Sequence, residues 1–360
     1  CSTGISWVKA HRFDKARVSH GVVFSTTREN RWHPLLGRWV TITGHRGSRP
    51  WQGGQVEAPL PAASFDPACY LCPGGQRISG QRNPEYDEIF VFDNDHPAFS
   101  VDAPPPEPAV GLFESQPAEG ICRVMCYSPN HGLRLSQLGN DQLLQVIEVW
   151  RDQTFELMTE QGFEQVFIFE NNGEVVGVSN PHPHCQIFAT SLQFSTLTQE
   201  LQATERYRAK TEGDLFDAMI RSEREDGRRI LCENSDWLGF VPYFAELPYE
   251  IMLLPKGRRR QLFQMPGQER ESLSVALRQV LVMLDHLWSV PQSYILSIRQ
   301  APLGLPEAHD YRCYLKLQPL LRGPGLQKYL AGIETGAGHF LNDGVPEIKA
   351  EELRAAGQGR

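Results

Sequence analysis

The segment Ser179-Asn180-Pro181-His182-Pro183-His184-Cys185-Gln186 carries two imidazoles and an amide at alternate positions near the middle of the chain. Residues two apart in a strand project from the same face, so an extended segment would bring His182, His184 and Gln186 to one site. The prolines favour an extended chain, and Pro183 indicates an edge or irregular strand. The pattern predicts a site that handles phosphate or metal.

His184 is the candidate nucleophile of this segment. A neutral imidazole can attack phosphorus near pH 7, and the bond it forms can pass its group on to a second phosphate. Such a two-step transfer depends on positioning and charge neutralisation, and Gln186 can donate a neutral hydrogen bond to a phosphoryl oxygen. The alternative is that these are ordinary strand residues bonded to the backbone, which fits an isolated histidine better than it fits His-Pro-His-x-Gln.

A second set of residues has the spacing of metal ligands. Cys69 and Cys72 form a C-x-x-C pair, which can supply one edge of a tetrahedral zinc site, and imidazoles often complete such a site. His131 and His182 are the expected partners, and Pro73-Gly74-Gly75 fits the tight turn of a zinc knuckle. Such a zinc would be structural because all four positions would be filled. An unligated buried pair of thiols is the alternative.

Binding of an anionic substrate would need a local basic cluster, because the chain has a net charge of -8. Arg46 and Arg49 lie in a basic turn after the predicted strand 39–43, and guanidinium groups bind phosphate through two parallel hydrogen bonds. Exposed arginines are also common on solvated faces. Asn94 and Asp95 lie in a predicted turn, where the carboxylate would accept from ribose hydroxyls or simply form an Asx turn.

The composition is that of a soluble enzyme, with 41% hydrophobic and 22% charged residues among 360. No apolar run is long enough for a membrane span, and no signal peptide is visible. Eight cysteines in a chain of this length do not indicate a disulfide scaffold. We therefore expect a cytoplasmic protein that binds neither membrane nor nucleic acid.

Two similar halves are expected along the chain. A shift of 127 positions (293 minus 166) places the predicted strand 293–298 on the predicted strand 166–171. The same shift superposes the predicted helix faces of the two halves, namely Leu273, Leu277 and Leu284 on Val146, Trp150 and Leu157. Shared patterning could also produce this match by chance, and that alternative stays open.

We predict an α+β fold of tandem halves with a mostly antiparallel sheet flanked by helices. The expected divisions are an N-terminal arm over 1–30, a catalytic half over 31–194 and a second half over 195–360. In the first half, a helix over 141–158 should begin at a cap formed by Asn140 or Asp141. The charged stretch 195–228 is expected to be helical and to link the halves.

These motifs, in their order along the chain, resemble those of the galactose-1-phosphate uridylyltransferases, a branch of the histidine-triad superfamily. The resemblance covers nearly the whole length from Arg31 onward. It rests on Arg46-Gly47-Ser48-Arg49-Pro50-Trp51, Cys69-Tyr70-Leu71-Cys72, Asn83-Pro84, Asn94-Asp95, Ser128-Pro129-Asn130-His131, Phe169-Glu170-Asn171 with Gly173, and the segment from Ser179 to Gln186.

The resemblance implies a nucleotidyltransferase of galactose metabolism that works by a ping-pong route. His184 would take the uridylyl group from UDP-glucose, release glucose 1-phosphate, and pass the group to galactose 1-phosphate or a related hexose 1-phosphate. Family members are homodimers with two histidine-triad-like halves in each subunit, and their active sites are completed across the interface.

The resemblance also implies roles for individual residues. The phosphates would be held by Gln186, Ser179, Asn171, Arg46 and Arg49, and the uridine by Asn94 and Asp95. The family's zinc ligands match Cys69, Cys72, His131 and His182. Some members bind a second metal, an iron, through a glutamate and three histidines; here those positions are Glu200, Arg299, Cys313 and Leu315, so we expect no second iron site.

The segment that contacts the hexose, contributed in the family by the partner subunit, corresponds to residues 328–334. Lys328 and Glu334 match the family and are expected to bind substrate, whereas Ile333 and Phe340 replace polar contacts. The ending over 332–342 is also similar to plant ADP-glucose phosphorylase. A nucleotide-sugar phosphorylase or adenylyltransferase that uses inorganic phosphate is therefore an alternative. A second alternative is an inactive zinc-bound binding protein.

Overall fold

The computed structural model describes residues 17–19, 22–24, 26–53, 55–57, 63–108, 110–288 and 291–358. Most of the arm predicted over 1–30 lies outside these residues. Within it, β1 (Arg17–Ser19) pairs with β2 (Val22–Phe24), and β3 (Arg28–His33) begins before the predicted boundary at residue 31. In the described part of the chain, no helix is both long and apolar enough to span a membrane.

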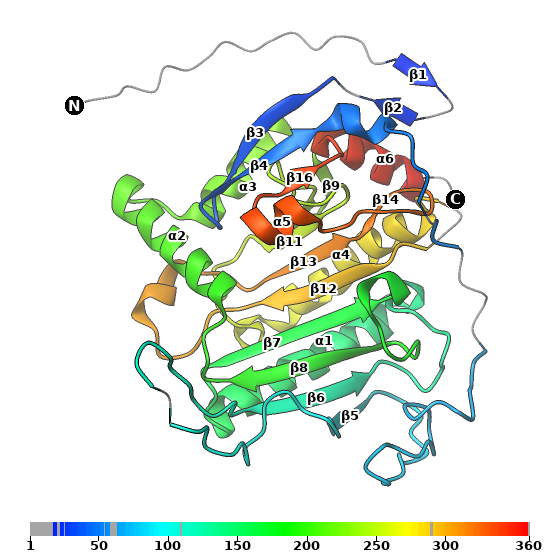
Figure 1. The fold of residues 1–360 in the computed structure, drawn as a ribbon, viewed down its shortest axis with the longest axis vertical. Coiled ribbons are helices and arrows are strands. Elements are labelled where there is room, and N and C mark those ends of the chain that lie inside the picture. The colour runs from blue at the N-terminus through cyan, green and yellow to red at the C-terminus, as the bar shows by residue number, and fades with distance from the viewer. Residues whose placement is uncertain are drawn as a thin grey trace.

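One nine-stranded sheet forms the centre of the molecule, and every neighbouring pair of its strands is antiparallel. Figure 1 shows this sheet running from β5 at the lower edge to β9 near the top. In spatial order its strands are β5 (Phe90–Asp93), β6 (Ile121–Cys126), β8 (His184–Thr190), β7 (Gln165–Asn172), β12 (Tyr294–Arg299), β13 (Tyr314–Pro319), β11 (Ile251–Pro255), β10 (Trp237–Phe240) and β9 (Ile230–Glu233).

The sheet is built from two copies of one topology. Two strands, a long helix and two more strands follow one another in each half, with α1 (Asn140–Phe155) in the first half and α4 (Gly267–His286) in the second. The strand order β5-β6-β8-β7 is repeated in mirror order as β12-β13-β11-β10. The two helices begin 127 positions apart (267 minus 140), which is the shift that the sequence pattern predicts. The α+β fold class with tandem halves is therefore confirmed.

Helices α1 and α4 cover one face of this sheet, behind the strands in Figure 1, and the largest hydrophobic core lies between them and the sheet. Trp150 and Leu277 are fully buried there, as the helical periodicity predicts. The predicted cap of α1 is wrong by one residue. Gly139 precedes the helix, and its backbone N–H donates to the side chain of Gln142 at 3.1 Å. A π-helical turn over Glu156–Glu160 extends α1.

The opposite face is covered in the second half by α2 (Ser195–Thr211) and α3 (Leu215–Asp226), which confirms the helical prediction over 195–228. A small sheet of β3, β4 (Arg38–Thr43) and β16 (Leu341–Asn342) lies at the top of Figure 1, near α5 (Gly332–Ala337) and α6 (Pro346–Gln358). A separate hairpin joins β14 (Leu321–Gly323) to β15 (Leu326–Gln327).

Candidate functional site

Strand β8 begins at His184, two residues later than the sequence predicts. His182 therefore lies before the strand and is fully buried, so the expectation that it shares one strand face with His184 and Gln186 is wrong. The strand alternation holds from His184 onward. Cys185 points to the helical face, where its Sγ accepts from the indole N–H of Trp150 at 3.3 Å. His184 and Gln186 consequently project from the other face of the sheet.

The ring of His184 is held in one tautomer by the backbone. Its Nδ1 lies 2.7 Å from the carbonyl oxygen of His182, and because a carbonyl can only accept, Nδ1 must carry the hydrogen. In the neutral ring the lone pair is then on Nε2. Burial lowers the pKa of His184, although its hydrogen bond to the carbonyl of His182 acts in the opposite direction. The geometry therefore gives a neutral imidazole with a nucleophilic Nε2 at pH 7.

Strand β7 contributes to the same face. Phe169 is paired with Gln186, and continuing this antiparallel register places Asn171 opposite His184. Gly173 follows with φ of 96°, and a Cβ at this position would lie 2.3 Å from Oγ of Ser293. Only glycine fits this turn, from which the chain returns towards His184.

Two other predicted residues of the segment differ in their surroundings. Ser179 is exposed, in the loop that leads back to β8, whereas Gln186 is half-buried on the strand itself. The structure thus brings Asn171, His184 and Gln186 to one face of adjacent strands and leaves Ser179 at its margin.

The predicted metal ligands converge into one buried cluster. One possible ligand atom from each of Cys69, Cys72, His131 and His182 lies within 4.8 Å of all the others. The Sγ of Cys72 is 3.6 Å from Nδ1 of His131 and 3.5 Å from Nδ1 of His182. Nε2 of His182 lies 2.9 Å from the carbonyl oxygen of Ser128, so this nitrogen carries the hydrogen and Nδ1 is left to face the thiols.

This cluster fits a metal ion in both donor type and protonation. Burial lowers the pKa of His182 to about 4, which keeps the imidazole neutral, as a ligand must be. Burial also raises the pKa of the Cys72 thiol to about 11, and a bound cation would favour its thiolate form. Two sulfurs and two nitrogens constitute a donor set typical of tetrahedral sites.

Asn180 connects two members of this cluster, Cys69 and His182, and the sequence had predicted no role for it. Its Oδ1 accepts from the backbone N–H of His182 at 2.9 Å, and its Nδ2 lies 3.4 Å from Sγ of Cys69. The side chain is buried. The Asn180-Pro181 dipeptide could have indicated this role, because an asparagine side chain often accepts a hydrogen bond from the backbone N–H two residues further along the chain.

The loop after β5 carries Asn94 and Asp95. Oδ1 of Asn94 accepts from the backbone N–H of His96 at 2.9 Å, so the Asx turn named as the simpler alternative is present. Asp95 faces a different segment. Its Oδ2 accepts from the backbone N–H of Ser79 at 3.1 Å, and its Oδ1 lies 3.6 Å from the guanidinium of Arg77.

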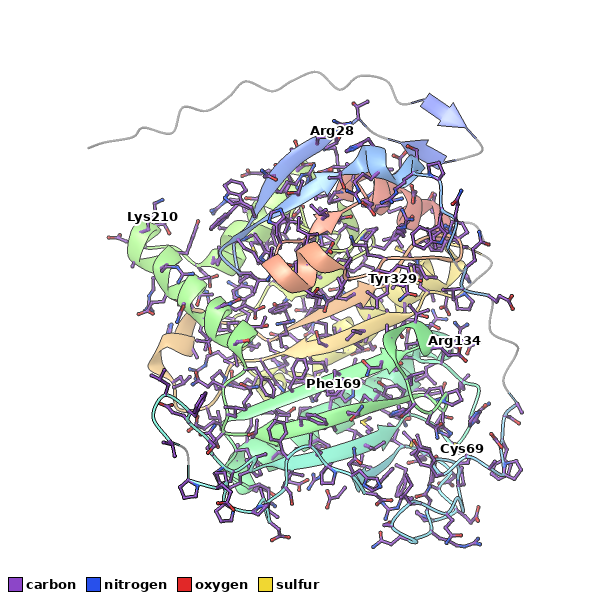
Figure 2. All side chains as sticks on the ribbon, in the orientation of Figure 1. Arg28, Cys69, Arg134, Phe169, Lys210 and Tyr329 are labelled. Atoms are coloured by element: carbon purple, nitrogen blue, oxygen red, sulfur yellow. The ribbon has the colours of Figure 1, made fainter. Side chains whose placement is uncertain are left out.

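The basic turn lies in a 3-10 helix over Gly44–Ser48, beside the C-terminal part of the chain. Nε of Arg46 is 3.4 Å from Asp343, and the ring of Trp51 stacks on Tyr329 with centroids 5.8 Å apart. Among the described residues, no hydrogen bond or ion pair connects Arg46 or Arg49 to strand β8. In Figure 2, Tyr329 is labelled above Phe169 and Cys69 below it.

In the predicted hexose segment, Lys328 and Glu334 form a buried ion pair with an N···O distance of 2.9 Å. Ile333, which replaces a polar contact of the family, is 41% exposed. Phe340 instead lies beneath the guanidinium of Arg38, 4.7 Å from its ring centroid, and is half-buried.

Glu200 is fully engaged by protein groups. Its carboxylate lies 3.1 Å from the guanidinium of Arg299, accepts from the hydroxyl of Tyr314 at 2.8 Å, and accepts a further hydrogen bond from Tyr311. Cys313 is buried, and its burial raises the pKa of its thiol. These contacts occupy both oxygens of the only carboxylate at the positions of the family's second metal site.

Comparison with known proteins covers nearly the whole chain. Residues 22–193 match the family described as galactose-1-phosphate uridyl transferase, N-terminal domain, and residues 200–358 match its C-terminal domain. The chain is 35% identical to a galactose-1-phosphate uridylyltransferase of Haemophilus influenzae, over 90% of this chain and 93% of that protein. It is 33% identical to the Saccharomyces cerevisiae enzyme of that name, over 92% of this chain and 95% of the other.

Solved structures show the same fold. A uridylyltransferase structure superposes with a TM-score of 0.75 at 27% identity, covering 92% of this chain and 99% of that one. An ADP-glucose phosphorylase from Arabidopsis thaliana has a TM-score of 0.72 at 21% identity, covering 91% and 98%, and shares the fold. From the two domain matches and the identity to curated relatives, this chain belongs to the galactose-1-phosphate uridyl transferase family.

Proposed function

We propose that this protein is a UDP-glucose–hexose-1-phosphate uridylyltransferase. It transfers a uridylyl group from UDP-glucose to galactose 1-phosphate, or to a related hexose 1-phosphate, through a covalent uridylyl-His184. The observation that carries this proposal is the 2.7 Å contact from Nδ1 of His184 to the carbonyl of His182, because it leaves the lone pair of Nε2 for attack.

The transfer takes place in two balanced steps. In the first, Nε2 of His184 forms a bond to the α-phosphorus of UDP-glucose, and the bond from phosphorus to the bridging oxygen breaks to release glucose 1-phosphate. In the second, a phosphate oxygen of the hexose 1-phosphate attacks the same phosphorus, and the P–N bond breaks. The acceptor is already an anion, so no general base is needed, and His184 ends in its starting form.

Groups around His184 would steady the transferred phosphoryl group. Gln186 and Asn171 lie on the same sheet face and can donate neutral amide hydrogen bonds, and Ser179 lies in the adjoining loop. Asn94 and Asp95 would bind the uridine. The half-buried position of His184 keeps water partly away from the reacting phosphorus.

The metal of the buried cluster is proposed to be zinc, held by Cys69, Cys72, His131 and His182. When bound, it would supply a structural cross-link and no chemistry, because all four tetrahedral positions are filled by side chains. The contacts of Glu200 with Arg299 and two tyrosines support the expectation that no second iron site exists, which stays a prediction.

We propose a homodimer in which the basic turn and the hexose segment serve the active site of the other subunit. The stacking of Trp51 on Tyr329 joins these two parts into one surface. Tyr329, Leu330 and Ile333 on this surface are 47%, 48% and 41% exposed, and a partner subunit could cover these neighbouring side chains. Tyr329 of this surface is labelled apart from Phe169 in Figure 2, and Phe169 pairs with Gln186 of β8.

Two organisational proposals accompany this activity. The chain divides into an arm over 1–30, a catalytic half over 31–194 and a second half over 195–360. The protein acts in the cytoplasm, which is supported by the free state of all seven cysteines in the described part of the chain.

Incubation of the protein with UDP-glucose alone, followed by intact-mass analysis, tests the covalent route. We expect one uridylyl adduct per chain, absent in His184→Ala and discharged by galactose 1-phosphate. Measurable turnover without any adduct would contradict the mechanism. Parallel incubation with ADP-glucose and inorganic phosphate tests the phosphorylase alternative, and an adenylyl adduct under these conditions would favour it. No turnover or adduct with either nucleotide sugar would favour the inactive binding protein.

A further inference from the structure

A single arginine holds the loop that follows β5. The guanidinium of Arg77 lies over the ring of Phe92, 4.6 Å from its centroid, and 3.6 Å from Oδ1 of Asp95. It also donates to the side-chain carbonyl of Gln81. The side chains of Arg77 and Asp95 are only 10% and 14% exposed. This ion pair is therefore largely shielded from solvent, which strengthens it relative to an ion pair on the surface.

Arg77 reaches this position because it is carried by a short hairpin that grows out of the cysteine pair. The backbone N–H of Arg77 donates to the carbonyl of Gln81 at 2.8 Å, and the N–H of Gly80 donates back to Arg77 at 2.9 Å. Gly80 has φ of 86°, as this tight turn requires. At the base of the hairpin, the side chain of Asn83 donates to the carbonyl of Cys72 at 3.0 Å. The hairpin is thus anchored at the candidate metal cluster.

The other side of Arg77 is held by an aromatic stack. Phe92 stacks on Phe90 with centroids 5.2 Å apart, and Phe90 stacks on Tyr86 at 4.9 Å. Phe92 lies in β5, three residues before Asp95. The guanidinium is consequently fixed by a rigid ring face below it and a carboxylate at its edge, a geometry that suits the planar fork of arginine and not the ammonium of lysine.

Asp95 retains capacity for a ligand in this arrangement. Each carboxylate oxygen can accept about two hydrogen bonds. Among the described residues each oxygen makes one contact, since Oδ2 accepts from the backbone N–H of Ser79 and Oδ1 faces Arg77. An unpaired carboxylate would also repel the phosphates of a nucleotide, and the positive charge of Arg77 offsets this repulsion.

We propose that Arg77 is the positioning residue of the nucleoside site. It fixes the carboxylate of Asp95 in the place and orientation at which both ribose hydroxyls of the nucleotide are bound, and it thereby sets the preference for ribose over deoxyribose. This inference rests on the proposed function, because it takes the loop of Asn94 and Asp95 as the uridine site. It assigns to Arg77 no contact with the reacting phosphorus.

Calorimetric binding of UMP and of 2′-deoxy-UMP tests this role without any need for turnover. The variants are Arg77→Gln, Arg77→Lys and Asp95→Asn. The matched control is Arg82→Gln, which removes the same charge from the same hairpin, where the exposed Arg82 only donates to the carbonyl of Gly74. Metal content and melting temperature are measured for each variant.

We expect the unchanged protein and Arg82→Gln to bind UMP about tenfold more tightly than 2′-deoxy-UMP, the size of one well-made hydrogen bond. Arg77→Gln should weaken binding of both ligands, because both carry the 3′-hydroxyl and the phosphate, but should weaken UMP roughly tenfold more than 2′-deoxy-UMP, so that the preference disappears. Arg77→Lys should keep part of the preference for UMP. The double variant of Arg77→Gln and Asp95→Asn should bind UMP only slightly more weakly than Arg77→Gln alone.

Two outcomes would overturn the inference. One is an Arg77→Gln variant that retains the ribose preference. The other is a variant that loses both ligands equally together with its metal, since this would mean that Arg77 acts only in folding. Failure of the proposed function has a different signature: the unchanged protein would bind UMP with the ribose preference and still form no uridylyl adduct.

Discussion

Nδ1 of His184 donates to the carbonyl oxygen of His182 at 2.7 Å, so a residue of the candidate metal cluster orients the proposed nucleophile through its own backbone. The imidazole of His182 faces Cys72, while its carbonyl faces the ring two residues further along the chain. The two histidines of this motif thus make separate contacts, and the backbone of His182 fixes the ring of His184.

The state of His184 predicts how transfer depends on pH. Burial places its pKa below the ordinary value of 6.5, and only the neutral ring has a lone pair on Nε2. Adduct formation should therefore stay constant as the pH falls from 8 to about 6.5 and decline only as the pH passes through the lowered pKa. Single-turnover adduct formation, quenched and followed by mass between pH 4.5 and 8, measures this. A midpoint at or above 6.5 would contradict the prediction.

Asn180 should control metal affinity although it is not a proposed ligand. Its amide bonds both to Sγ of Cys69 and to the N–H of His182, so Asn180→Ala removes support from two ligands at once. Loss of such a supporting hydrogen bond typically lowers metal affinity about 10–100-fold. Competition with a chromophoric chelator measures the change.

A suitable control for this variant is Asn172→Ala, which removes the same amide from a half-buried position where it bonds only to the carbonyl of Gln292 at 3.5 Å. It should bind metal as the unchanged protein does. Equal affinity in both variants would show that Asn180 has no part in the metal site. A chain purified without chelator and containing no zinc would contradict the structural site itself.

Much of this architecture was predictable from the sequence because it follows periodicity and spacing. The positions of α1 and α4, the strand at β7 and the gathering of Cys69, Cys72, His131 and His182 were all expected. The start of β8 was not, because the alternation of His182 and His184 fits a strand that begins two residues earlier equally well. The contacts of His182 with Cys72, Asn180 and Ser128 hold it outside the sheet.

Contacts between residues that are distant along the chain leave no local pattern in the sequence. Nothing local to Arg46 indicates that it meets Asp343, and nothing local to Glu200 indicates that Arg299 and Tyr314 fill its oxygens. The sequence around Arg77 gives no sign of its contacts either. Its significance depends on Phe92 and Asp95, which β5 brings beside it.

Glu170 predicts a measurable link between pH and stability. It lies fully buried on the helical side of β7, and burial raises its pKa to about 8, although Tyr127 and Tyr294 act to lower it. Between pH 4.5 and 8 the folded chain keeps this proton and the unfolded chain loses it, so folding takes up a proton. Stability from this group therefore falls as the pH rises, by at most about 1.4 kcal/mol per pH unit.

Glu170→Gln should remove that dependence, because the amide is neutral at every pH and has nearly the same shape. Urea unfolding at pH 5, 6.5 and 8 would compare the two proteins. The stability of the variant relative to the unchanged protein should increase with pH across this range. If the free energies of unfolding of the two proteins change with pH in parallel, the carboxyl group of Glu170 ionises in the folded state with an ordinary pKa.

The proposed exchange of residues between subunits predicts complementation between two inactive variants. His184→Ala lacks the nucleophile, and Lys328→Ala lacks the cation of the hexose segment and leaves the buried Glu334 unpaired. Each homodimer should transfer the uridylyl group poorly. A mixed dimer has one site in which both defects meet and one site in which neither is present, so up to half of the activity per dimer should return in it.

The measurement is co-expression of the two variants with different affinity tags, tandem purification of the mixed dimer, and assay of transfer to galactose 1-phosphate. Ile333→Glu, which places a charge on the exposed apolar surface, should weaken the dimer and lower activity in proportion to the monomer formed. A mixed dimer that is no more active than its parents would place Lys328 and His184 in the same subunit's site. A monomeric protein with full activity would exclude the shared site altogether.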